Sequence, residues 1–233
     1  MAAISGAIFD CDGTLVDSMT MWGGAIDHLV AQHGKVAPAG FKDHVESMTI
    51  AATCRAMHDE LGVGESGPKL VEELEAYVEH EYATHIREIP GARAFLQSLA
   101  DAGVPMVVAS STTSRLVRGA LKVHGLDGYF QDVLCTAEVR DGRDKDYPDV
   151  YLEGLDRLGT PMEQTWVFED APFGIRTARR AGFHVAAVYN EQDRRDAGFM
   201  RAWADIFSVE YESISLAAIR AFDDATRRPM PEA

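Results

Sequence analysis

The order of apolar and polar residues divides the chain into a short buried strand, a helical stretch and a long alternation of helices and strands. The strand covers residues 7–9, a partly β-branched apolar run that stops at Asp10-Cys11-Asp12-Gly13, as a buried strand does when it enters a turn. From about residue 19 to residue 85 the apolar positions recur with helical spacing, and no convincing strand interrupts them. The pattern therefore predicts a helical insert directly after the first strand.

Helices and strands alternate in the rest of the chain. We expect helices at residues 92–102, 115–124, 148–158, 172–181 and 216–222, and strands at 104–109, 133–135, 165–168, 184–189 and 205–207. Such βαβ alternation, with glycine closing several helices, is typical of a parallel sheet between two helix layers. We predict an α/β fold with a Rossmann-like, three-layer core formed by residues 1–18 and 86–233, and an inserted helical-bundle cap formed by residues 19–85.

Composition and charge narrow the range of partners. The 233 residues include 22 Lys plus Arg and 37 Asp plus Glu, which gives a formal net charge of −15. Nucleic-acid binding depends on clustered basic residues, and here these form only isolated pairs, so we expect no nucleic-acid partner. No apolar run reaches the roughly 18 to 20 residues of a membrane span. We expect no membrane contact and, because the three cysteines are far apart in the sequence, a cytoplasmic location.

The candidate chemistry lies after the predicted strands, because open parallel sheets bind ligands at the carboxyl ends of their strands. The polar residues at these positions are Asp10, Asp12, Ser110, Ser111, Lys145, Glu169 and Asp170. Carboxylates gathered at one point repel each other unless a cation lies among them, and hard oxygen ligands suit Mg²⁺. The sequence therefore predicts a Mg²⁺ site that binds a phosphoryl group together with Lys145, while Ser110 and backbone N–H groups donate hydrogen bonds to it.

The two aspartates after the first strand can serve different purposes. Asp10 and Asp12 are two residues apart, and Gly13 lets the chain turn immediately after them. One carboxylate can attack the phosphorus atom while the other handles protons. Attack by a carboxylate would form an aspartyl phosphate and divide a difficult displacement into two easier steps.

Four segments resemble, in order, the motifs of the haloacid dehalogenase superfamily of aspartate-nucleophile phosphatases. They contain Asp10-Cys11-Asp12-Gly13-Thr14, Val107-Val108-Ala109-Ser110, Lys145-Asp146-Tyr147-Pro148 and Val167-Phe168-Glu169-Asp170. The match spans the whole chain, and the helical cap after the first strand is similar to that of the β-phosphoglucomutase-like subgroup. Asp146 departs from the pattern, since this subgroup usually has proline after the lysine.

The resemblance implies a role for each motif residue. Asp10 is expected to be the nucleophile and Asp12 the general acid and base. The implied phosphate ligands are Ser110, Ser111 and Lys145. The implied Mg²⁺ ligands are Asp10, the backbone carbonyl of Asp12, Asp170 and, near it, Glu169. By this resemblance the protein is a Mg²⁺-dependent hydrolase of a small phosphomonoester, such as a sugar phosphate.

Two other functions stay open at this point. A phosphomutase resembling β-phosphoglucomutase shares the fold and motifs, but that family has a cap histidine where this chain has Trp22, and a cap arginine that this chain lacks before Arg55. A non-catalytic phosphate-binding protein would not need both aspartates. Specificity depends on the cap, where the candidate substrate contacts are Trp22, Met48, Thr49 and Arg55. Because the cap has to move, we expect a monomer.

Overall fold

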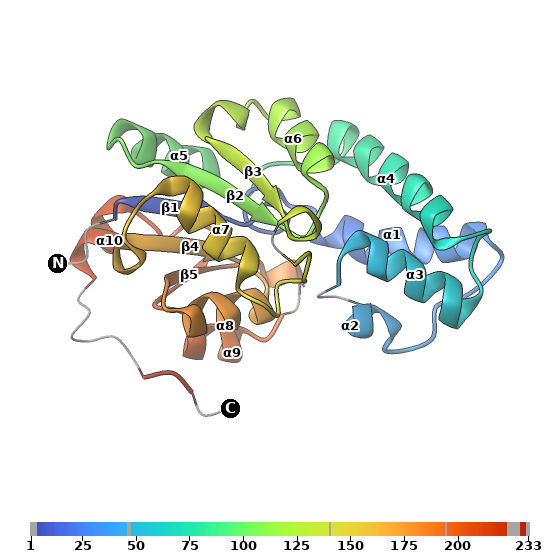
Figure 1. Ribbon diagram of the computed structural model, residues 1–233. Coiled ribbons are helices and arrows are strands. Elements are labelled where there is room, and N and C mark those ends of the chain that lie inside the picture. Colours follow the sequence, from blue (N-terminus) through green and yellow to red (C-terminus); the bar gives the residue numbers. More distant parts are fainter. Residues whose placement is uncertain (1–3, 46–47, 140, 194, 223–228, 232–233) are drawn as a thin grey trace.

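A six-stranded parallel sheet forms the centre of the computed structural model, which describes residues 4–45, 48–139, 141–193, 195–222 and 229–231 (Figure 1). The strand order is β3-β2-β1-β4-β5-β6. The strands are β1 (Gly6–Phe9), β2 (Met106–Ser110), β3 (Asp132–Cys135), β4 (Thr165–Glu169), β5 (His184–Tyr189) and β6 (Ile206–Val209). β1, β2 and β4 are buried along their whole length, which explains why they are almost entirely apolar.

Helices cover both faces of the sheet. Successive residues of each strand point to opposite sides, so these apolar strands present apolar side chains on both faces. Phe9 of β1 packs into the layer that contains α5 (Ala92–Asp101), α6 (Ser114–Val123) and α10 (Leu216–Ala221). Its neighbour Ile8 packs into the opposite layer, which contains α7 (Asp149–Leu158), α8 (Pro172–Ala181) and α9 (Ala197–Trp203). The prediction of an α/β, Rossmann-like, three-layer core is confirmed.

In the described part of the chain, four helices follow β1 before α5 begins. They are α1 (Met19–Gln32), α2 (Phe41–Val45), α3 (Ile50–Leu61) and α4 (Gly67–Thr84). In Figure 1 they lie together beyond the carboxyl ends of the central strands. Leu70, Leu74 and Val78 of α4 recur with helical spacing and are buried, as the apolar pattern of this stretch predicts.

The elements expected from the sequence occur within about two residues of their predicted bounds. The helix α9 is not predicted from the sequence, because its seven residues are too few for a clear apolar period. Its start is marked by Asp196, whose side chain accepts a hydrogen bond from the Phe199 N–H. Within the part of the chain that the structure describes, every helix is too short or too polar to cross a bilayer.

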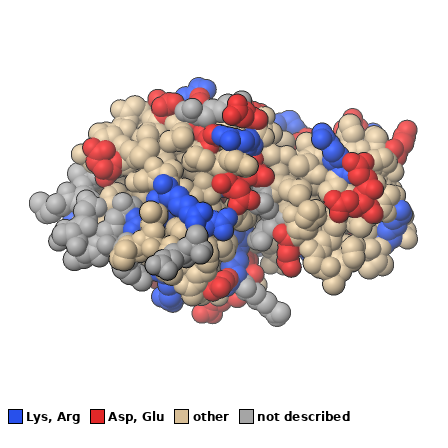
Figure 2. All heavy atoms as spheres, turned by 60° about the horizontal axis from the view of Figure 1, so that its bottom comes forward, with Lys and Arg blue, Asp and Glu red and all other residues tan. Residues whose placement is uncertain are grey.

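Charge is unevenly distributed over the surface. Figure 2 shows basic side chains gathered over α8 and α9, and acidic side chains over the lobe formed by α1 to α4. Two of the basic groups lie on aromatic rings of the same chain: the Arg180 guanidinium is 5.2 Å from the ring centre of Trp203, and that of Arg201 is 3.7 Å from the ring centre of Phe207. These two arginines therefore help to cover the outer side of the α8–α9 layer.

Candidate active site

The carboxyl ends of β1, β2 and β4 meet at a pocket of about 500 Å³ between the sheet and the helices α1 to α3. Seven residues that the sequence analysis places at the site line this pocket: Asp10, Asp12, Ser110, Ser111, Lys145, Glu169 and Asp170. They come together because neighbouring parallel strands end at the same edge of the sheet. The structure thus brings residues up to 160 positions apart in the sequence, Asp10 and Asp170, into one site.

Lys145 is the central cation of the site. Its Nζ donates a hydrogen bond of 2.5 Å to Asp10 Oδ1 and one of 2.7 Å to Glu169 Oε1, and its side chain is only 3% exposed. Burial lowers the pKa of Lys145, but the two carboxylates outweigh this effect and raise it well above its usual range. Lys145 is therefore a permanent ammonium held directly against Asp10.

Glu169 fixes the position of that ammonium. Its Oε1 also accepts a hydrogen bond of 3.0 Å from the Tyr151 hydroxyl, and its Oε2 accepts the backbone N–H groups of Asp170 at 2.7 Å and Ala171 at 2.9 Å. Burial raises the pKa of Glu169, but Lys145 and these N–H donors hold it below its ordinary value. Glu169 is thus a fully hydrogen-bonded anion that anchors Lys145.

Asp10, Glu169 and Asp170 form a cluster that could hold a metal ion. Each offers a carboxylate oxygen, these atoms lie within 4.8 Å of one another, and all three residues are buried. Burial raises the pKa of Asp10 to about 7 even though Lys145 opposes the change. Burial, with the charges of Glu169 and Asp10, also raises the pKa of Asp170 well above its usual range, against the effect of Arg195. The cluster is short of positive charge, and its oxygen donors suit Mg²⁺.

Gly13 is required for the close approach of the first and fourth motifs. Its φ is +83°, and a Cβ atom at this position would lie 2.1 Å from Asp170 Oδ2. A side chain here would therefore be strained and would push the Asp170 carboxylate away. The Asp-Gly pair that looks like an ordinary turn in the sequence allows two elements of the site to pack together.

Asp12 lies outside this cluster and is held by hydroxyl groups. Its Oδ1 accepts hydrogen bonds from Ser18 Oγ at 2.6 Å and from the Tyr82 hydroxyl, and its Oδ2 accepts one of 2.8 Å from Thr112 Oγ1. Asp10 and Asp12 thus have different surroundings: Asp10 faces an ammonium and two carboxylates, whereas Asp12 faces neutral donors. This difference fits the separate roles that the sequence analysis assigns to them.

The two serines at the end of β2 are suited to an anionic ligand. Ser110 Oγ accepts a hydrogen bond of 3.0 Å from the Thr112 backbone N–H, which orients it at the pocket. Ser111 Oγ is shielded from solvent and has no hydrogen-bond partner among the residues described. A buried hydroxyl without a partner is costly, and a phosphate oxygen in the pocket would supply one.

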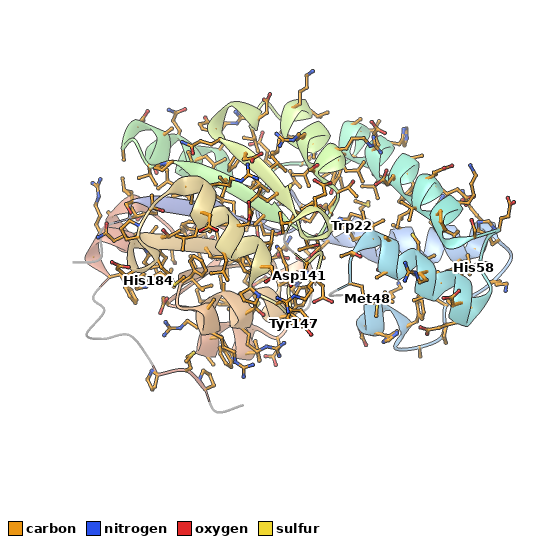
Figure 3. All side chains as sticks on the ribbon, viewed as in Figure 1. Trp22, Met48, His58, Asp141, Tyr147 and His184 are labelled. Atoms are coloured by element: carbon orange, nitrogen blue, oxygen red, sulfur yellow. The ribbon has the colours of Figure 1, made fainter. Side chains whose placement is uncertain are left out.

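The four candidate substrate contacts in the cap separate into two pairs. Trp22, which is on α1, and Met48, which lies just before α3, line the pocket (Figure 3). Thr49 and Arg55 are not among its lining residues: Thr49 accepts a hydrogen bond from the Ala52 N–H at the start of α3, and Arg55 is exposed on that helix. The structure therefore brings only Trp22 and Met48 to the site.

Several residues that line the pocket or contact Asp12 are not predicted from the sequence. Arg195 Nη2 lies 3.2 Å from Asp170 Oδ2. Both carboxylate oxygens of Asp193 are shielded from solvent without a hydrogen-bond donor among the described residues, and burial raises the pKa of Asp193 to about 6 against the opposing effect of Arg195. Tyr82 and Thr112 contact Asp12. Only Thr112 carried a signal in the sequence, because it follows the Ser110-Ser111 pair.

Comparisons with known proteins agree with this geometry. A model of the haloacid dehalogenase-like hydrolase family matches residues 7–188, a range that contains the whole cluster. The chain is 34% identical over 186 residues to Hexitol phosphatase A of Escherichia coli (strain K12), a match that covers 78% of this chain and 82% of the relative. It is 32% identical over 190 residues to Validoxylamine A 7'-phosphate phosphatase of Streptomyces hygroscopicus subsp. limoneus, with 80% and 86% covered.

A solved structure shows the same fold. The crystal structure of beta-phosphoglucomutase from Clostridium difficile matches with a TM-score of 0.75 and 16% identity, and the match covers 93% of this chain and 96% of that chain. At this identity the likeness concerns the fold alone.

Proposed function

The chain belongs to the haloacid dehalogenase-like hydrolase family, and within it we propose a Mg²⁺-dependent phosphatase that transfers the phosphoryl group of a small phosphomonoester first to Asp10 and then to water. The relatives named above are phosphatases, in agreement with the resemblance of the four motifs. The observation that carries the proposal is the contact of Asp10 with Lys145 beside Glu169 and Asp170. This arrangement supports a nucleophile, a phosphate-binding cation and a metal site next to one another.

The metal would bind the carboxylates of Asp10 and Asp170 and the backbone carbonyl of Asp12, with Glu169 next to it. The donors are oxygens and carry more negative charge than Lys145 can balance, so they fit Mg²⁺. When bound, the ion neutralises charge on the carboxylates and on the phosphate oxygens. We expect its removal to leave the fold intact and to abolish activity.

In the first step Asp10 attacks the phosphorus atom and the alcohol leaves. Lys145 orients Asp10 and binds a phosphate oxygen, while the hydroxyls of Ser110 and Ser111 donate to the others. Asp12 gives its proton to the leaving oxygen. In the second step Asp12 takes a proton from water, and this water displaces phosphate from Asp10.

We further propose that residues 19–85 form a cap over a core made of residues 1–18 and 86–233. Pocket residues such as Trp22 and Met48 come from the first part and Asp10 from the second, so closure would exclude bulk water from the phosphoryl group. The monomeric state and the cytoplasmic location expected from the sequence stay predictions.

The pocket wall supports a sugar or polyol phosphate as the substrate. Trp22, Ile26 and Met48 offer an apolar surface, and Asp193 offers two carboxylate oxygens that accept no hydrogen bond from the described residues. A sugar has both an apolar face and hydroxyl donors, and the two relatives named above act, by their names, on a hexitol phosphate and on validoxylamine A 7'-phosphate. The same pocket wall argues against the phosphomutase reaction, because a mutase has to hold a second phosphate. Among the described residues of 19–85, the cationic side chain that lines the pocket is Lys42. Its ammonium is already paired with the Asp27 carboxylate at 2.5 Å.

The test is phosphate release from a panel of hexitol phosphates, aldose phosphates, glycerol phosphate, nucleotides and 4-nitrophenyl phosphate, each with Mg²⁺ or with EDTA. We expect Mg²⁺-dependent release, fastest for a polyol or sugar monophosphate, and loss of release in Asp10→Asn. Isomerisation without net phosphate release would indicate a mutase. Binding of the esters without any turnover would indicate a non-catalytic phosphate-binding protein.

A further inference from the structure

The acid–base residue Asp12 is fixed by hydroxyl groups from three separate parts of the chain. Ser18 lies just before α1, Thr112 follows β2, and Tyr82 lies near the end of α4. All three residues are buried, and Tyr82 is only 2% exposed. The Tyr82 contact connects positions 70 residues apart, so it is a tertiary contact between α4 and the first motif.

Tyr82 acts as a hydrogen-bond donor throughout the ordinary pH range. Burial, together with the charge of Asp12, raises the pKa of its hydroxyl well above the usual range, against a smaller opposing effect from Trp22. Its ring contributes to the apolar core, where it packs with Val78 and Leu74 on the buried face of α4. The ring alone would satisfy that packing, so the hydroxyl directed at Asp12 is an additional feature.

The hydrogen bonds to Asp12 leave one of its two carboxylate oxygens able to react. A carboxylate has about four lone-pair sites, two on each oxygen. Ser18 and Tyr82 occupy both sites of Oδ1, and Thr112 occupies one site of Oδ2. Among the described residues no donor occupies the fourth site, which is on Oδ2, and Asp12 lines the pocket together with Asp10.

We propose that Tyr82 is a positioning residue for proton transfer: together with Ser18 and Thr112 it fixes the Asp12 carboxylate so that Oδ2 exchanges the proton with the leaving alcohol. This inference rests on the proposed function and adds a residue from α4 to it. The O–H bond of the leaving alcohol forms as the Asp12 O–H bond breaks, while Tyr82 keeps its own proton. The hydrogen bonds to Oδ1 also stabilise the carboxylate that Asp12 becomes.

Leaving-group dependence distinguishes this role from a structural one. An alkoxide is a poor leaving group and needs the proton from Asp12, whereas 4-nitrophenolate leaves without protonation. Because kcat/KM reports steps up to the first irreversible one, it reports phosphorylation of Asp10 and not the later hydrolysis. We expect Tyr82→Phe to lower kcat/KM about 10- to 100-fold for the fastest alkyl phosphate of the panel, the range for a hydrogen bond to a charged group. For 4-nitrophenyl phosphate the loss should stay below about threefold.

Two further variants complete the experiment. Tyr77→Phe removes a hydroxyl from the same helix, where the Tyr77 ring stacks on His28 at 4.5 Å, and should leave both rates unchanged. In an Asp12→Asn background, Tyr82→Phe should cause almost no additional loss, because the two residues act through one interaction. If Tyr82→Phe does not fold, as judged by thermal unfolding, Thr112→Val is used in its place and should show the same selective loss.

Equal losses for the alkyl and the aryl ester, or additive losses in the double variant, would overturn the positioning role while leaving the phosphatase intact. Absence of Mg²⁺-dependent turnover in the unmodified protein would instead overturn the proposed function and this inference with it. The two failures are therefore distinguishable. The selective loss in Tyr82→Phe alone, with normal rates in Tyr77→Phe, would establish the role.

Discussion

Replacing the proposed nucleophile should make the metal-free protein more stable. Burial raises the pKa of Asp10 from 3.8 to about 7, so its ionised form is disfavoured in the folded state. At about 1.4 kcal/mol for each pKa unit, the charged carboxylate costs the fold about 4 kcal/mol at pH 8. Asp10→Asn removes the charge, retains a carbonyl oxygen that can accept from Lys145, and should recover most of this energy.

The sign of the pH dependence follows from the direction of the shift. A carboxyl group with a raised pKa destabilises the fold fully above its folded pKa, here about 7, and the cost disappears as the pH falls towards the ordinary value of 3.8. At pH 5 the cost is reduced to about 2 kcal/mol. The stability gain from Asp10→Asn should therefore be about 2 kcal/mol smaller at pH 5 than at pH 8.

Urea unfolding at both pH values in the presence of EDTA measures these differences. Asp59→Asn, which neutralises an exposed carboxylate on α3, is the matched control for a change in net charge. Adding Mg²⁺ should reduce the difference in unfolding free energy between Asp10→Asn and the unmodified protein, because the unmodified site gains binding energy that the variant lacks. The reasoning is refuted if Asp10→Asn is no more stable than the unmodified protein at pH 8, or if its advantage grows as the pH falls.

Three other changes test separate parts of the structure. Lys145→Met leaves buried carboxylates without their cation, so it should lower the free energy of unfolding by about 3 to 5 kcal/mol. It should also lower the rate of phosphate release by at least about 100-fold. Gly13→Ala places a Cβ atom against Asp170 and should lower kcat/KM about 10-fold and weaken Mg²⁺ activation, measured by metal titration. Asp205→Ala removes the carboxylate that lies 3.2 Å from Arg179 and should cost about 3 kcal/mol in urea unfolding, with kcat/KM at 20 °C within about twofold.

Each of these expectations has a contrary result. Unaltered unfolding of Lys145→Met would show that the buried ammonium does not compensate the carboxylates. Normal Mg²⁺ activation of Gly13→Ala would show that Asp170 can move without consequence. A large loss of activity in Asp205→Ala at a temperature where it is folded would mean that this remote ion pair does more than support β5, whose Val185 N–H also donates to Asp205.

The core of the site could be predicted because topology alone brings it together. Asp10 and Asp170 both follow buried strands, and parallel neighbours end at one edge, so their proximity requires only the strand assignments. Lys145 lies in a loop, and its position beside Asp10 came from the order of the motifs. The structure explains why Lys145 is held there: Glu169 accepts a hydrogen bond from Lys145 and is itself fixed by the backbone N–H that follows β4.

The remaining site residues could not be predicted, because their positions depend on how helices and loops pack. Tyr82 has the spacing of a core residue, and nothing in the sequence indicates that its hydroxyl reaches Asp12. Asp193 lies in a short 3₁₀ helix, Glu191–Asp193, without a periodic signal. Arg55 was proposed from its place in the sequence alone, but the turn of α3 on which it lies directs it to solvent.

The most direct test of the central claim is to trap the phosphoryl group on Asp10. Asp12→Asn, which lacks the general base for hydrolysis, is mixed with 4-nitrophenyl phosphate and Mg²⁺, quenched in acid and analysed by peptide mass spectrometry. We expect the mass of one phosphoryl group on the peptide that contains Asp10, sensitive to hydroxylamine and absent when EDTA replaces Mg²⁺. Phosphate release without any phosphorylated Asp10, or an Asp10→Asn variant that turns over at the normal rate, would contradict it.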